Sequence, residues 1–144
     1  MNDPFNLQRF VAAQDSVYGS VVAELQAGRK ESHWMWFVFP QIQGLGYSGM
    51  AVKYAIASAA EARAYLEHPV LGPRLRECVK LVLAIEDASA WDIFGSPDDL
   101  KFRSSLTLFA EAATDHQLFR AALEKYFESE PDSLTLQLLG TRNR

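Results

Sequence analysis

The chain has one cysteine and no long uninterrupted run of apolar residues. A single thiol, Cys78, cannot form an internal disulfide, which excludes the disulfide-stapled secreted domains and leads us to expect a cytoplasmic protein. The first four residues lack the basic start and apolar stretch of a secretion signal. No segment approaches the roughly 18 apolar residues of a membrane span, so we expect a soluble chain without a membrane partner.

The chain also lacks an excess of positive charge. Its formal net charge is −4, and residues 81–144 hold six basic against eleven acidic side chains. Proteins that grip nucleic acid neutralise phosphates with clustered lysine and arginine. The acidic C-terminal half therefore argues against a nucleic-acid partner.

The length of 144 residues and the apolar fraction of 49% are enough for one hydrophobic core. Apolar residues recur at helical spacing, and no alternating strand pattern of useful length occurs. We therefore expect an all-α fold: a single compact domain spanning residues 1–144, with about six to eight helices, several of them short. Residues 138–144 are expected to form a flexible tail.

Capping residues mark where these helices begin and end. Asp3-Pro4 is typical of a helix start and Gly28 of a helix end, so residues 4–27 form one bent helix or two short ones. The longest clear helix is expected over residues 70–85, with Cys78 on its buried face. Further expected elements are a helix opened by Ser58, a capped turn over 89–95, helices starting near Asp98 and Asp115, and a closing turn over 134–139.

Residues 33–41 (HWMWFVFPQ) gather four aromatic side chains beside one imidazole and are followed by Gly44-Leu45-Gly46. We favour a helix here, which would bring His33, Trp36, Phe37 and Pro40 to one side. An imidazole against an indole suits a flat ligand such as a purine, flavin-like or nicotinamide ring. The alternative is that His33 is a core histidine bonded to a backbone carbonyl.

A second polar constellation lies in residues 98–107. On a helix, Asp98, Lys101 and Ser105 share one face. At minimum Asp98 and Lys101 form a surface ion pair worth roughly 0–1 kcal/mol. A glycosidase-like site is a second interpretation, with Asp98 as general acid or base, Lys101 on a phosphate, and Ser105 or Thr107 on a hydroxyl. A third is a Ser-Lys pair formed by Lys101 and Ser105.

Other catalytic signatures are missing. The sequence has no phosphate-binding Gly-x-x-x-x-Gly-Lys loop, no Gly-x-Gly-x-x-Gly after a strand and no His-Glu-x-x-His. Its three histidines are too scattered to predict a metal site. We therefore predict neither a metal nor a cofactor.

The aromatic block, together with residues 98–109 (DDLKFRSSLTLF), closely resembles a family of small bacterial proteins of unknown function, often labelled calpastatin. The resemblance covers nearly the whole chain and implies a single all-helical domain. The calpastatin label conflicts with the sequence, because that inhibitor's repeats are disordered whereas this chain forms a core. A more distant similarity links the chain to NADAR-type N-glycosidases, which act on ADP-ribose-linked and riboflavin-pathway intermediates.

The resemblance singles out a set of polar positions and two candidate stacking residues. Asp98, Lys101 and His33 are the predicted catalytic residues. The predicted ligand-binding residues are Trp34, Trp36, Gln41, Ser48, Ser105 and Thr107.

Two functional hypotheses follow. In the first, the aromatic block and the segment starting at Asp98 converge on a pocket that hydrolyses the N-glycosidic bond of an ADP-ribose-type or nucleotide-derived metabolite. Under it, Asp98→Asn is expected to abolish turnover with a nearly unchanged thermal midpoint. In the second, the same pocket is a non-catalytic module that binds a metabolite or a protein. The sequence does not determine the oligomeric state.

Overall fold

The computed structural model describes residues 3–142, and these form an all-helical domain as expected. The described residues contain ten α-helices, more than the six to eight expected. The only β-type pairing among them is an isolated parallel bridge between Ile42 and Ile56. The helices are α1 (Gln8–Asp15), α2 (Tyr18–Gln26), α3 (Met35–Val38), α4 (Gly49–Lys53), α5 (Ala59–Glu67), α6 (Leu71–Ala84), α7 (Ala90–Phe94), α8 (Asp98–Ala112), α9 (Gln117–Phe127) and α10 (Ser133–Arg142).

Two of the helices, α4 and α10, lie where no helix was expected. The N-terminal segment is two helices, α1 and α2, and the first begins only at Gln8 although Asp3 accepts hydrogen bonds from its entering N–H groups. The expected closing turn at 134–139 is part of α10, which also takes in residues 138–142 of the expected flexible tail. Residues 143–144 of that tail lie outside the described residues.

The expected caps form at several helix ends. The Ser58 hydroxyl accepts from the Glu61 N–H at the start of α5, and Ser89 and Asp92 form a reciprocal capping box on α7. Gly28 ends α2 with a φ of +82°, a conformation that costs glycine least. At α9 the N-cap residue is His116 instead, and Asp115 accepts a hydrogen bond from Gln117 N.

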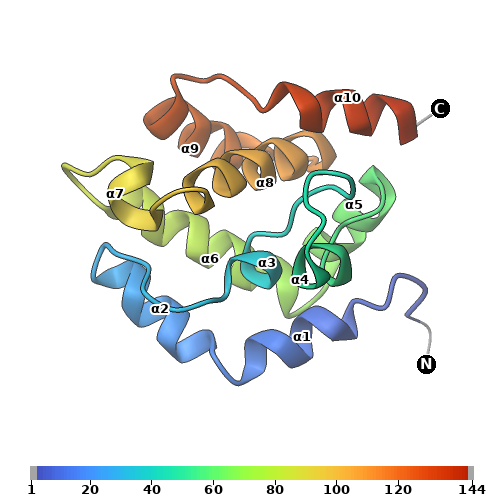
Figure 1. Ribbon diagram of the computed structural model, residues 1–144, viewed down its shortest axis with the longest axis horizontal. Helices are drawn as coiled ribbons and strands as arrows, with labels where there is room; N and C mark the ends of the chain where they lie inside the picture. Colours follow the sequence, from blue (N-terminus) through green and yellow to red (C-terminus); the bar gives the residue numbers. More distant parts are fainter. Residues whose placement is uncertain (1–2, 143–144) are drawn as a thin grey trace.

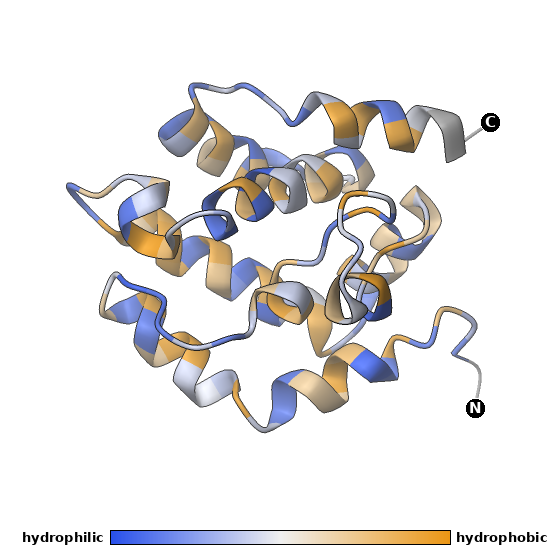
Figure 2. Ribbon diagram, viewed as in Figure 1, coloured by the Kyte–Doolittle hydropathy of each residue, from blue (hydrophilic) through white to orange (hydrophobic). Residues whose placement is uncertain are grey.

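The long helices pack on one another in the middle of the molecule. Helix α6 contacts α2, α5 and α9, while α8 contacts α5, α7, α9 and α10. Figure 1 shows α1 and α2 along one side and α10 along the opposite side, with α3 and α4 in front. Figure 2 shows orange and blue residues interleaved along α6 and α9, as expected of helices that bury one face.

Aromatic rings from distant segments fill the core. The ring centroid of Phe102 in α8 lies 4.9 Å from that of Phe39 and 4.7 Å from that of Phe94. Such contacts join the aromatic block, α7 and α8 beyond simple burial. Cys78 is buried as expected, and burial raises the pKa of its thiol to about 12, so it stays protonated at neutral pH.

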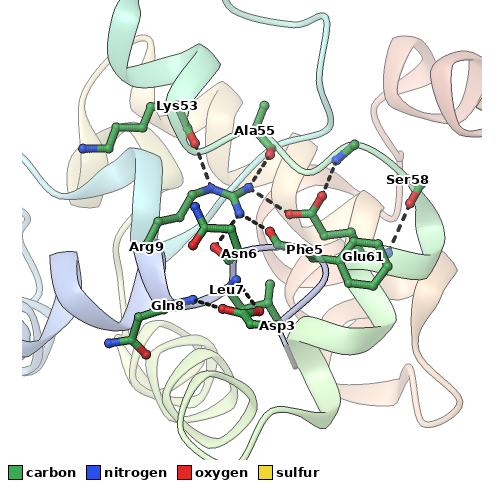
Figure 3. Close-up of polar contacts among 11 residues, drawn as sticks. Asp3, Phe5, Asn6, Leu7, Gln8, Arg9, Lys53, Ala55, Ser58 and Glu61 are labelled. Atoms are coloured by element: carbon green, nitrogen blue, oxygen red, sulfur yellow. Dashed lines mark hydrogen bonds and ion pairs between the residues drawn. The ribbon is translucent and has the colours of Figure 1, made fainter. Parts of the chain in front are cut away.

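Arg9 ties three segments together at one guanidinium group (Figure 3). Its nitrogens donate to the Glu61 carboxylate at 2.8 Å, to the carbonyl oxygens of Lys53 and Ala55, and to two carbonyls in the turn before α1. The other oxygen of Glu61 accepts from Ala57 N at 3.0 Å. The Glu61 side chain is almost fully buried, so the ion pair must be satisfied on both sides.

This network fixes the loop that follows α4. Residues 53–57 are held by Arg9 and Glu61 from one side, while Ile56 N donates to Gln41 O at 2.9 Å and Gln43 N donates to Ile56 O at 2.8 Å on the other. The segment after the aromatic block is thereby positioned even though it contains little regular structure.

We predict that Arg9→Met lowers the free energy of unfolding by about 3–5 kcal/mol, because it leaves the buried Glu61 carboxylate without its cation. Urea denaturation measures the change. Arg63→Met, on the exposed side of α5, is the matched control and is expected to stay within about 0.5 kcal/mol of the parent. An equal loss in both variants would show that Arg9 has no special structural role.

Candidate functional site

A pocket of about 400 Å³ lies between the loop before α4 and the first turns of α8. Pro97, Leu100, Lys101 and Ser104 line it from α8 and its start, because these spacings share one helix face. We call it the Trp36 pocket. Its other lining residues are Trp36, Gln41, Leu45, Gly46, Tyr47, Ser48, Ala51 and Asp132.

Four of the predicted site residues meet at this pocket. Trp36 and Gln41 approach from the aromatic block, Ser48 approaches from the loop after it, and Lys101 approaches from α8. The Lys101 ammonium lies 5.3 Å from the centroid of the Trp36 ring. Such a contact holds the cation against the pocket wall. Whether these residues bind a ligand stays a prediction.

The expected helical face of the aromatic block does not form. Helix α3 has only four residues, Met35–Val38. Pro40 follows it closely, and residues 31–34 before it form a loop. His33 therefore precedes the helix and is exposed, which also excludes a core histidine. It is not among the residues that line the Trp36 pocket, so the geometry does not favour its predicted catalytic role.

Trp34 lies in the core, away from the pocket lining. Its indole N–H donates to Glu24 at 3.0 Å, and Glu24 also accepts from Glu31 N at 2.6 Å and from both the N–H and the hydroxyl of Ser32. Burial alone raises the pKa of the Glu24 carboxyl, but these donors outweigh burial and lower that pKa to about 2. One carboxylate thus fastens the entry to the aromatic block.

Asp98 is held between two ammonium groups. One oxygen lies 2.9 Å from Lys30 and the other lies 3.4 Å from Lys101, the expected ion pair. The Lys30 side chain is only 7% exposed and lies 5.1 Å from the Trp34 ring centroid. Asp98 does not line the Trp36 pocket. In this geometry it pairs with both Lys30 and Lys101 and holds them in place.

Ser105 and Thr107 face the interior. The Ser105 Oγ is buried and has no hydrogen-bond partner within residues 3–142, so the alternative Ser-Lys pair with Lys101 does not form. Thr107 donates to Arg103 O at 2.9 Å and accepts from Asp132 N at 2.9 Å. It therefore acts indirectly, by holding the backbone of Asp132 at the pocket.

Sequence reasoning missed four residues of this region: Lys30, Tyr47, Ser104 and Asp132. The pairing of Lys30 with Asp98 and the approach of Asp132 join segments far apart in the chain, which local spacing does not reveal. Ser104 was detectable, since it lies one turn from Leu100 and Lys101. Tyr47, which is 87% exposed at the pocket rim, lies beside the glycines that mark an irregular loop.

No three His, Cys, Asp or Glu side chains in the described part of the chain gather closely enough to hold a metal ion. Nor is any helix within residues 3–142 both long and apolar enough to cross a membrane.

The fold and the pocket define a small all-helical domain with an aromatic and cationic surface site. The chain belongs to the family described as "Protein of unknown function (DUF1810)", whose model matches residues 4–139. It is similar to the conserved hypothetical protein Rv1873 from Mycobacterium tuberculosis, with 57% identity, coverage of 96% of this chain and 99% of that chain, and a TM-score of 0.95. The search of curated proteins gave no match.

We predict that Glu24→Gln lowers the thermal midpoint by a few degrees at pH 7. The folded pKa of Glu24 is about 2 against an ordinary value of 4.5, so its stabilisation is complete above pH 4.5 and is lost as the pH falls toward 2. The difference in midpoint between parent and variant should therefore shrink over that range. Glu67→Gln, an exposed control, should show no such pH-dependent difference, and a constant gap for Glu24→Gln would contradict the assignment.

The ion pairs change the expectation for Asp98→Asn. The substitution leaves the buried Lys30 ammonium unpaired, so we predict that the free energy of unfolding falls by about 3 kcal/mol. This value is at the lower end of the range for broken buried ion pairs because the Asp98 side chain is 20% exposed. Urea denaturation of Asp98→Asn, Asp99→Asn and the double variant Asp98→Asn/Lys30→Met measures it. The double variant should recover part of the loss, and Asp99→Asn should lose less than about 1 kcal/mol. If Asp98→Asn is as stable as the parent, the expectation from the sequence of a nearly unchanged thermal midpoint holds instead.

Proposed function

We propose that this chain binds a nucleotide-derived or ribosyl small molecule in the Trp36 pocket. The observation that carries the proposal is that Lys101, which lines this pocket together with the Trp36 indole, shares the single carboxylate of Asp98 with Lys30. One carboxylate against two ammonium groups leaves one positive charge in the cluster. An anionic group such as a phosphate would complete the pairing.

Lys101 is the member of the cluster that can meet the ligand. Its side chain is 25% exposed against 7% for Lys30, and it lines the pocket whereas Lys30 does not. A phosphate that replaces water at Lys101 gains a charge-assisted hydrogen bond without uncovering Lys30.

The remaining lining suits the other parts of such a ligand. Trp36 and Tyr47 offer aromatic surface for a heterocyclic ring. The Ser104 hydroxyl donates to Leu100 O and so can still accept, and the Ser48 hydroxyl accepts from Ala51 N and so can still donate. The volume of about 400 Å³ falls within the roughly 300–1,000 Å³ of small-molecule pockets.

Hydrolysis of an N-glycosidic bond is a second candidate, favoured by the presence of Asp132 in the same pocket as Lys101. In that reaction the bond between the sugar carbon and the base nitrogen breaks, its electron pair leaves with the base, and water supplies a hydroxyl to the carbon and a proton to the base. The developing positive charge on the sugar needs a nearby carboxylate. Asp132 suits that role better than Asp98, because it lines the pocket whereas Asp98 does not and is shared by two lysines. The Oδ2 atom of Asp132 caps the start of α10 by accepting from the N–H and the hydroxyl of Thr135.

We predict that a nucleoside monophosphate, ADP-ribose or ribose 5-phosphate binds this chain, and that Lys101→Met weakens binding roughly tenfold or more through the lost charge-assisted contact. Isothermal titration measures affinity, and chromatography of the same mixtures detects any released base. Lys80→Met, on the exposed face of α6, is the control with the same charge change.

The outcomes separate the two candidates. Binding that depends on Lys101, without released base, supports a binding module. Released base that is lost in Asp132→Asn supports the hydrolase, since asparagine still caps the start of α10. Equal affinity in Lys101→Met and Lys80→Met, or no binding across the series, contradicts the proposal.

A further inference from the structure

A second cleft, of about 440 Å³, has in its lining Lys30, the partner of Asp98. Arg29 and Lys30 form one wall, and the segment from Trp91 to Gly95 forms the other. The two clefts share no lining residue. We call the second one the Trp91 cleft.

The walls of the Trp91 cleft are fixed relative to each other. Lys30 N donates to Ile93 O at 2.7 Å, and the Lys30 ammonium is anchored on Asp98 at the start of α8. A Cβ added at Gly95 would meet no atom within 4 Å, so the cleft is open above that backbone. The cleft therefore lies between two segments, α7 and the loop before α3, whose relative position is fixed by these contacts.

Trp91 is exposed in a way that packing does not explain. The residue is 63% exposed, whereas tryptophan is usually well buried because of its large apolar surface. It is the second residue of the five-residue helix α7, whose other apolar members, Ala90, Ile93 and Phe94, are buried. A ring that stacks on this exposed indole would remove apolar surface of both rings from water.

The charged groups of the cleft favour an anion. Arg29 is exposed and makes no ion pair with any described residue. Asp92 is occupied by the capping box, where it accepts from Ser89 N. Lys30 is paired with Asp98. Arg29 is therefore the cation of the cleft lining that is free to pair with an anion.

We propose that the Trp91 cleft is a second small-ligand site, which takes a planar aromatic ring bearing an anionic group. The ring stacks on the Trp91 indole and the anion pairs with the Arg29 guanidinium, whose planar fork suits either a carboxylate or a phosphate. The site uses no residue of the Trp36 pocket and does not rest on the function proposed for it.

The test is a titration followed by the indole N–H signals in ¹⁵N-¹H NMR spectra. The probes are 2-naphthoate and 2-naphthyl phosphate as planar anions, and 2-naphthylmethanol as the neutral ring. Single substitutions of Trp36 and Trp91 by phenylalanine assign the signals. We expect a saturable shift of the Trp91 signal with one or both anions. The apparent affinity should fall roughly tenfold in Arg29→Gln and stay unchanged in Arg63→Gln, a matched exposed arginine on α5.

Each result decides the proposal. A response to only one anion supports it and identifies the anion class. An equal response to 2-naphthylmethanol, or equal affinities in the Arg29→Gln and Arg63→Gln variants, overturns anionic recognition. If the Trp91 signal shows no saturable shift at several millimolar probe, the proposed site is overturned. A shift confined to the Trp36 signal also overturns it, but does not contradict the function proposed for the Trp36 pocket. Unchanged Trp34 and Trp36 signals in the Arg29→Gln and Arg63→Gln variants without probe confirm that both variants have folded.

Discussion

The ion pair between the largely buried guanidinium of Arg9 and the carboxylate of Glu61 is the interaction on which the arrangement around the pocket depends. The guanidinium satisfies the almost fully buried carboxylate of Glu61 and four backbone carbonyls at once. Arginine can do this because its five N–H donors are fixed in one plane. Through the loop at residues 53–57, the network holds Ile56 against the segment that begins at Gln41, and that segment forms one side of the Trp36 pocket. The irregular loop that lines the Trp36 pocket is thus held in place by a polar network whose two charged residues, Arg9 and Glu61, do not line the pocket.

Two acidic side chains with different tasks position the aromatic block and α8. Glu24 collects the donors of the loop before α3, including the Trp34 indole, and fixes where the aromatic block begins. Asp98 joins Lys30 in that loop to Lys101 on α8. Both carboxylates are engaged by several partners, which suits a positioning role better than proton transfer. Asp132 differs from them in its place, since it lines the pocket, and its Oδ2 accepts from the N–H and the hydroxyl of Thr135.

Much of the fold could be predicted from local spacing, while the site could be predicted only in part. The long helix of residues 70–85 corresponds to α6, and the caps at Ser58 and Ser89 form as expected. The helix over the aromatic block was predicted too long, since large rings buried on all sides give no clear period. For this reason His33, expected beside Trp36, is an exposed loop residue instead.

By itself, the sequence determined the helical class, the buried state of Cys78 and the pairing of Asp98 with Lys101, because each depends on residues within a few turns of one helix. Only the tertiary structure decided that Lys30 shares Asp98, that Asp132 reaches the pocket and that Ser105 does not. It also decided that Trp34 is a core residue while Trp36 lines the pocket. These outcomes depend on how distant segments pack and on which donors and acceptors must be satisfied once water is excluded.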